Sequence, residues 1–143
     1  MEITSTEPNT KTILLADDEQ FIAVAYKDGL ERAGYDVTVA HDGQEAMELL
    51  KTLRPDIMLL DLIMPRMNGF EVLQAMQNDP ELRDIPVLVL TNLSQPADEA
   101  EAREFGVVDF MVKADVSLRD LLERLDQLLA GGIDLTDLDL TGE

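Results

Sequence analysis

Residues 56–73 read DIMLLDLIMPRMNGFEVL and contain a complete strand, loop and helix. The first part, Asp56 to Leu60, is an apolar run that stops at an acid, Asp61. A short apolar run of this kind is typical of a strand buried on both faces of a sheet. The stretch from Met64 to Gly69 predicts a loop, and the pattern from Phe70 to Asn78 predicts a helix.

The same order of strand and helix recurs on both sides of this stretch. Four further strands are expected at 12–16, 35–40, 85–90 and 107–112. Four further helices are expected at 19–33, 44–53, 96–105 and 118–130, the last of them capped by Ser117. Five strands that alternate with five helices predict an α/β protein with a parallel sheet covered by helices on both faces.

Apolar spacing also predicts which side of two helices faces the sheet. In the first helix the inward residues are expected to be Ile22, Ala25, Tyr26 and Ala33, and in the second Ala46, Leu49, Leu50 and Leu53. This leaves Phe21 and Val24 on the outer side of the first helix. Exposed apolar residues are typical of a partner interface, so we hypothesise that these two residues contact another protein. The alternative is that both are partly buried.

Composition narrows the possible functions. The 143 residues carry a formal charge of −19, which argues against binding to nucleic acid or to an anionic membrane surface. The chain has no Cys, so disulfides, thiolate catalysis and Cys-based metal sites are excluded, and its single His cannot build a His-rich site. No signal peptide is visible, and we expect a cytoplasmic protein. Residues 1–11 are expected to be flexible, and residues 131–143 form an acidic tail.

Charged and hydroxyl residues follow four of the predicted strands. They are Asp17-Asp18, Asp61, Thr91 and Lys113. Ligands bind beyond the carboxyl ends of the strands in an open parallel sheet, and a strand order of 2-1-3-4-5 would bring the three acids into one pocket. Such acids repel one another unless a hard cation such as Mg²⁺ joins them. A carboxylate can attack a phosphoryl group, and the lysine and the threonine can stabilise the phosphoryl oxygens.

These residues resemble those of the receiver domains of two-component response regulators, the family of CheY. The matching stretches are ILLADDE, DIMLLDLIMPRMNGFEVL, VLVLTN and DFMVK, and the likeness covers residues 12–130. The resemblance implies a flavodoxin-like (βα)5 fold and a stand-alone switch, not a turnover enzyme. It also implies that Asp61 accepts phosphate from the phosphohistidine of a histidine kinase or a phosphotransfer protein, and that an unidentified downstream protein reads the result.

The resemblance further assigns a role to each residue of the predicted site. Asp18 and Asp61 would bind Mg²⁺ directly, Asp17 would act mainly through water, and the backbone carbonyl of Ile63 would be another ligand. Thr91 would be the switch hydroxyl, Lys113 would contact the phosphate, and Phe110 would be the switch aromatic. On this basis Phe21 and Val24 would dock the dimerisation domain of the kinase.

Three features depart from the usual pattern of the family. Ala114 replaces the proline that usually follows the lysine, and we expect a trans bond because a cis bond before a non-proline residue costs about 3–4 kcal/mol. Asn92 replaces a small residue, which would narrow access to the phosphoryl group. Ile63 and Leu93 replace residues that are often polar, which favours slow loss of phosphate.

Other interpretations remain open at this stage. Asp17-Asp18 could be a helix cap, and Phe110 an ordinary core residue. A Mg²⁺-dependent aspartyl phosphatase is a possible rival, although Asp61 lacks the acid two residues later that such enzymes carry. A second rival is an interaction module that works without phosphorylation. Nucleotide binding is a weak third, because neither GxxxxGK[ST] nor GxGxxG is present.

Overall fold

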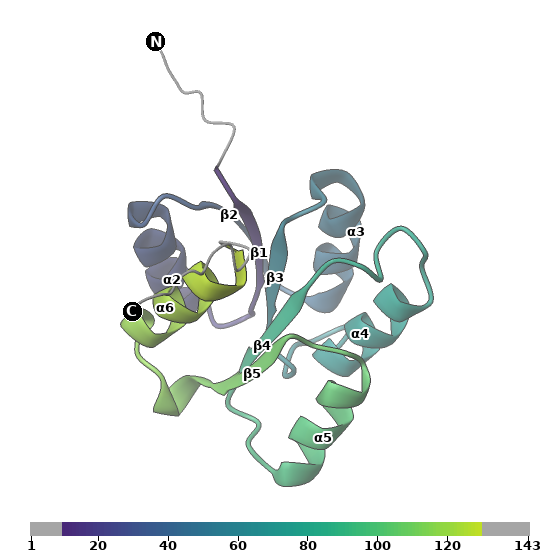
Figure 1. Ribbon diagram of the computed structural model, residues 1–143. Coiled ribbons are helices and arrows are strands. Elements are labelled where there is room, and N and C mark those ends of the chain that lie inside the picture. Colours follow the sequence, from purple (N-terminus) through teal and green to yellow (C-terminus); the bar gives the residue numbers. More distant parts are fainter. Residues whose placement is uncertain (1–9, 130–143) are drawn as a thin grey trace.

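A five-stranded parallel sheet forms the centre of the molecule (Figure 1). The computed structural model describes residues 10–129, so the predictions for residues 1–9 and for the tail at 131–143 lie outside the described residues. The strand order is β2-β1-β3-β4-β5, as predicted. The strands are β1 (Thr12–Ala16), β2 (Asp36–Ala40), β3 (Ile57–Leu60), β4 (Val87–Thr91) and β5 (Asp109–Val112).

Helices cover both faces of this sheet. Figure 1 shows α2 and α6 on one side and α3, α4 and α5 on the other. Their bounds are α2 (Gln20–Arg32), α3 (Gly43–Leu53), α4 (Gly69–Gln77), α5 (Pro96–Glu104) and α6 (Leu118–Leu129), with a 3-10 helix η1 (Lys113–Asp115) between β5 and α6. Within residues 10–129, no helix combines the length and the apolar character needed to span a bilayer.

Two apolar cores lie against the two faces because side chains alternate along each strand. On β1, Ile13 and Leu15 pack with α2 and α6, whereas Leu14 packs with the helices of the opposite face. Every residue of β3 and β4 is buried, which explains why these strands are continuously apolar. The polar residues therefore begin where this continuously apolar part of the sheet ends.

Most predicted boundaries agree with the structure to within one or two residues, and the end signals are confirmed. Gly34 has a φ of 105°, the left-handed conformation that ends α2. The Oγ of Ser117 accepts a hydrogen bond from the backbone N–H of Asp120 at 3.0 Å, which caps α6 as predicted. The second helix begins one residue earlier than predicted, at Gly43.

The predicted inward faces of α2 and α3 were partly wrong. Ala25 and Ala33 are exposed, and the buried side of α2 consists of Ala23, Gly29 and Leu30. The face is rotated because α6 packs closely over α2, so that a side chain at Gly29 would collide with Leu118. Leu53 is also exposed, because it is the last residue of α3 and lies beyond the edge of the core.

Candidate functional site

Polar residues gather where the carboxyl ends of the central strands meet. Asp17 follows β1, Asp61 follows β3 and Lys113 follows β5, while Thr91 is the last residue of β4. The parallel register places Ala16 beside Leu60, and the backbone N–H of Asp61 donates to the carbonyl of Ala16 at 3.0 Å. Neighbouring strands that end at one level therefore bring together residues that are far apart in the sequence.

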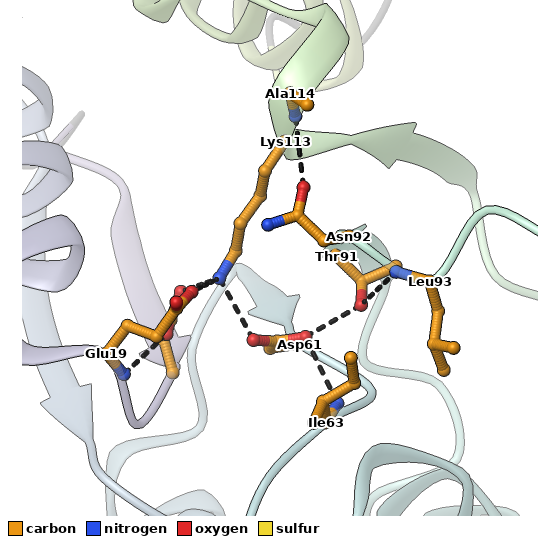
Figure 2. A network of polar contacts seen from close by, with 9 residues as sticks. Glu19, Asp61, Ile63, Thr91, Asn92, Leu93, Lys113 and Ala114 are labelled. Atoms are coloured by element: carbon orange, nitrogen blue, oxygen red, sulfur yellow. Dashed lines mark hydrogen bonds and ion pairs between the residues drawn. The ribbon is translucent and has the colours of Figure 1, made fainter.

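Asp61 is the centre of this group and is only 4% exposed (Figure 2). Its Oδ1 accepts hydrogen bonds from the hydroxyl of Thr91 at 2.7 Å and from the backbone N–H of Ile63 at 3.1 Å. Its Oδ2 accepts a hydrogen bond from Nζ of Lys113 at 2.9 Å. One buried carboxylate thus contacts a hydroxyl, a backbone amide and an ammonium group, each of which stabilises negative charge.

Lys113 is buried among three carboxylates. Its Nζ lies 2.7 Å from Asp17, 2.8 Å from Glu19 and 2.9 Å from Asp61. Burial alone would lower the pKa of this lysine, but the short contacts of its ammonium group with the carboxylates of Asp17, Glu19 and Asp61 outweigh burial and raise the pKa. The lysine is therefore charged, and it is the cation that balances the site.

Glu19 is a site residue that the sequence analysis missed. Its carboxylate contacts Lys113, although half of its side chain is exposed. The stretch ILLADDE contained a signal, since Glu19 follows the two predicted acids directly. Asp18 is exposed and does not contact Lys113 in the described structure; it instead lines a cavity of about 220 Å³ together with Asp61 and Ile63.

Asp17 is the least satisfied group of the site. It is 1% exposed, and its Oδ2 makes no hydrogen bond of good direction despite the short ion pair with Lys113. Burial raises its pKa, and the nearby ammonium group of Lys113 and the hydrogen bond from the backbone N–H of Glu19 oppose this effect without cancelling it. Carboxylate oxygens of Asp17, Glu19 and Asp61 lie within 4.8 Å of one another. Clustered carboxylate oxygens of this kind are the ligands that a hard divalent cation prefers.

The residues that depart from the usual family pattern also have defined positions. The peptide bond between Lys113 and Ala114 is trans, as predicted, since no cis bond occurs in the described chain. The side-chain oxygen of Asn92 accepts a hydrogen bond from the backbone N–H of Ala114 at 3.1 Å (Figure 2). Asn92 also lines the 220 Å³ cavity beside Asp61.

Thr91 and Phe110 lie on the adjacent strands β4 and β5. Thr91 is fully buried, and its hydroxyl both donates to Asp61 and accepts from the backbone N–H of Leu93 at 3.3 Å. Phe110 is 9% exposed and belongs to the core on the face covered by α3, α4 and α5. The neighbouring strands place Phe110 opposite Val89, two residues before Thr91.

Gly69 allows α4 to begin directly beside the phosphoacceptor candidate. A β-carbon at this position would lie 2.6 Å from the carbonyl oxygen of Asp61 and 2.6 Å from Cα of Leu62. The N–H of Gly69 donates to the carbonyl of Leu62 at 3.1 Å, which closes the loop between β3 and α4. Only glycine fits this approach, because both obstructing atoms belong to the backbone.

Phe21 and Val24 are both exposed, with 94% and 66% of their surface accessible. The alternative that they are partly buried is therefore wrong. Phe21 lines a shallow apolar groove of about 440 Å³ that it shares with Tyr26, Ala114 and Lys113, so this groove adjoins the site. Val24 lines a different groove, between α2 and β2.

Comparison with known proteins gives a consistent result. The model of a family described as the response regulator receiver domain matches residues 13–126. The chain is 39% identical over 122 residues to the DNA-binding dual master transcriptional regulator RpaA of Synechocystis, covering 81% of this chain and 51% of that protein. It is 35% identical over 119 residues to the transcriptional regulatory protein PhoP of Bacillus subtilis, covering 83% and 48%. The chain spans about half the length of these relatives.

Solved structures agree with the observed topology. The receiver domain of the Francisella response regulator 1452 has a TM-score of 0.78 and 30% identity, covering 85% of this chain and 98% of that chain. The chemotaxis protein CheY4 of Vibrio cholerae has a TM-score of 0.76 and 30% identity, covering 82% and 98%. The five-stranded sheet and its order therefore match those of proteins with related sequences.

Proposed function

The chain belongs to the family of response regulator receiver domains, which are signalling switches and not turnover enzymes, and we propose that Asp61 is its phosphoacceptor. One observation carries this proposal: the buried carboxylate of Asp61 contacts both the Thr91 hydroxyl and the Lys113 ammonium. The hydroxyl and the cation around these two oxygens are also the groups that would stabilise the oxygens of a transferred phosphoryl group.

The proposed reaction is transfer of a phosphoryl group to Asp61. A carboxylate oxygen attacks the phosphorus of a phosphohistidine, the new O–P bond forms, and the P–N bond breaks. The electron pair of that bond leaves with the imidazole, which takes up a proton. Lys113 neutralises charge on the phosphoryl oxygens, and the hydroxyl of Thr91 donates to one of them.

The residues present fit a magnesium ion. Asp17 offers a buried oxygen without a hydrogen bond, and acids and a cavity lie beside Asp61. Asp18, Asp61 and the Ile63 carbonyl would hold the ion, and Asp17 would act mainly through water. When bound, the ion supplies positive charge to the phosphoryl oxygens. Glu19 is not among the residues that would hold the ion; its half-exposed side chain contacts Lys113.

The proposed output is a shift between two packings of one fold. Phosphate on Asp61 draws Thr91 inward, and Phe110 rotates into the space that Thr91 leaves. The surface formed by α5, β5 and α6 then changes for a downstream protein. The strand pairing that places Phe110 opposite Val89 supports this route, because Thr91 and Phe110 belong to adjacent strands.

The partner on the donor side is proposed to be a histidine kinase or a histidine phosphotransfer protein. Phe21 is the stronger docking residue, because its groove also reaches Lys113, whereas Val24 faces another groove. We expect Phe21→Ala to slow transfer from the cognate kinase more than Val24→Ala does. Transfer at the wild-type rate by the double variant would discard this interface, and phosphorylation by acetyl phosphate serves as the control that the site itself is intact.

The decisive experiment for Asp61 is intact mass spectrometry after incubation with Mg²⁺ and acetyl phosphate. A single added phosphate that is absent in Asp61→Asn supports the receiver mechanism. Continuous release of inorganic phosphate with fast turnover supports the phosphatase instead. Absence of any adduct supports an interaction module that works without phosphorylation.

A further inference from the structure

The loop between β3 and α4 carries a strained residue next to the proposed phosphoacceptor. Arg66 has a φ of 67°, in the left-handed region that residues with a β-carbon rarely adopt. The N–H of Met67 donates to the carbonyl of Pro65 at 2.6 Å, so the chain turns tightly at this point. A tight and unfavourable backbone conformation persists only when its surroundings hold it in place.

The contact that holds Arg66 comes from a distant part of the chain. Its Nε donates to Oδ2 of Asp42 at 2.9 Å, while Oδ1 of Asp42 accepts from the backbone N–H of Glu45 at 2.9 Å. Asp42 is the N-cap of α3, so its position is fixed by the helix it caps. The backbone hydrogen bond from Glu45 and, after it, the guanidinium group of Arg66 hold the pKa of Asp42 below its usual value.

The loop also meets α3 through its backbone. Gly43 lies so close to Met67 that a β-carbon there would collide with the carbonyl of Met67. The start of α3 therefore touches the loop at two points, one a close backbone contact and the other the ion pair. At its ends the loop connects to the site, because the N–H of Ile63 donates to Asp61 and the N–H of Gly69 donates to Leu62.

We propose that Asp42 and Arg66 are positioning residues for the site: their ion pair keeps the β3–α4 loop in the conformation that presents the Ile63 backbone to Asp61. Neither residue touches the reacting atoms. The proposal deepens the function proposed above, since Ile63 is the residue whose carbonyl is proposed to bind Mg²⁺, but the loop geometry can be tested without metal or phosphate.

The chain contains a matched control for this pair. Arg54 also has a positive φ, of 47°, and its guanidinium pairs with Glu81 at 3.0 Å. Arg54 is the C-cap of α3, so this second pair lies at the opposite end of the same helix. Arg54→Ala removes an arginine–carboxylate ion pair from a residue with a positive φ, at the end of α3 away from Asp42.

The first test measures amide hydrogen exchange by NMR in the metal-free protein. Arg66→Ala keeps the β-carbon, so its backbone cost is unchanged, and Asp42→Asn keeps an acceptor for the cap of α3. Both variants should increase exchange of the Ile63 and Gly69 amides about two- to fivefold, the range expected for an exposed ion pair. The amide of Asp61, which donates to the carbonyl of Ala16 in β1, should not change. Arg54→Ala should leave all three amides unchanged.

The second test measures Mg²⁺ affinity by calorimetry and asks whether the two residues act as a unit. Each single variant should weaken Mg²⁺ binding about two- to fivefold, and the double variant no further, because one interaction is lost in all three. Additive losses, or unchanged exchange at Ile63 and Gly69, would overturn the inference. Failure of the wild type to bind Mg²⁺ would instead refute the magnesium proposal, and the exchange result would still decide the role of the loop.

Discussion

Replacing Lys113 with methionine tests the electrostatic balance of the site most directly. The substitution fills a similar volume but removes the one cation that contacts Asp17, Glu19 and Asp61 at 2.7–2.9 Å. Glu19 can turn into solvent, but Asp17 and Asp61 are 1% and 4% exposed and cannot. Removing one partner of a buried pair costs about 3–5 kcal/mol, so the free energy of unfolding should fall by about that amount at pH 8 without metal.

The loss should shrink as the pH falls. Burial already raises the pKa of Asp17, and without the lysine the folded state of the variant binds protons more readily than the unfolded state. Stability therefore rises relative to wild type as Asp17 becomes protonated. Addition of Mg²⁺ should stabilise the variant more than the wild type, since the ion would supply the missing positive charge.

The assay is urea unfolding in EDTA at pH 8 and at pH 5, repeated at pH 8 with Mg²⁺. Lys27→Met is the matched control, because Lys27 pairs with Glu31 at 2.8 Å but is 40% exposed, and its loss should cost less than about 1 kcal/mol. A Lys113→Met variant as stable at pH 8 as Lys27→Met would show that the buried acids do not depend on the lysine.

Three further predictions concern single positions. Gly69→Ala should lower the free energy of unfolding by about 1–3 kcal/mol in urea, because its β-carbon would meet backbone at 2.6 Å; wild-type stability would show that the loop yields freely. Thr91→Val should cost about 1–3 kcal/mol, since Asp61 loses a buried hydrogen bond, and should slow phosphorylation by acetyl phosphate; an unchanged rate on intact mass would remove the hydroxyl from the mechanism. Asp42 has a pKa below its ordinary 3.8, so its contribution is present above that pH and lost as the pH falls; Asp42→Asn should therefore lose less stability than wild type between pH 5 and pH 3, and parallel urea curves would contradict this.

The positions of the strands could be predicted because each strand is a short apolar run followed by a breaker, whereas their order in the sheet was implied by the resemblance to receiver domains. The residues that end these strands were also predictable, since strand ends converge at one edge whatever the details of packing. Asp17, Asp61, Thr91 and Lys113 lie together for this reason. The alternation of side chains along a strand restricts which face of the sheet each residue can occupy. It can be recognised without knowing which helices pack against the strand.

The residues that the sequence analysis missed lie outside the strands, where side chains do not alternate between two faces. Glu19 follows β1 after the chain has left the sheet, so alternation does not say whether Asp18 or Glu19 turns towards Lys113. The inward face of α2 depends on how closely α6 approaches at Gly29, which is a property of two helices and not of one. The pair of Asp42 and Arg66 depends on a left-handed backbone that no local pattern around Arg66 indicates.

The hydrogen bond from the backbone N–H of Ala114 to Asn92 connects the ends of β4 and β5 at the site. Asn92 follows Thr91 directly, and Ala114 follows Lys113 directly, so the bond fastens the residue after the hydroxyl to the residue after the ammonium. We therefore expect a displacement of either strand end to be transmitted to the other through this hydrogen bond. A smaller side chain at position 92 would lack the acceptor, and the two strand ends would then move independently.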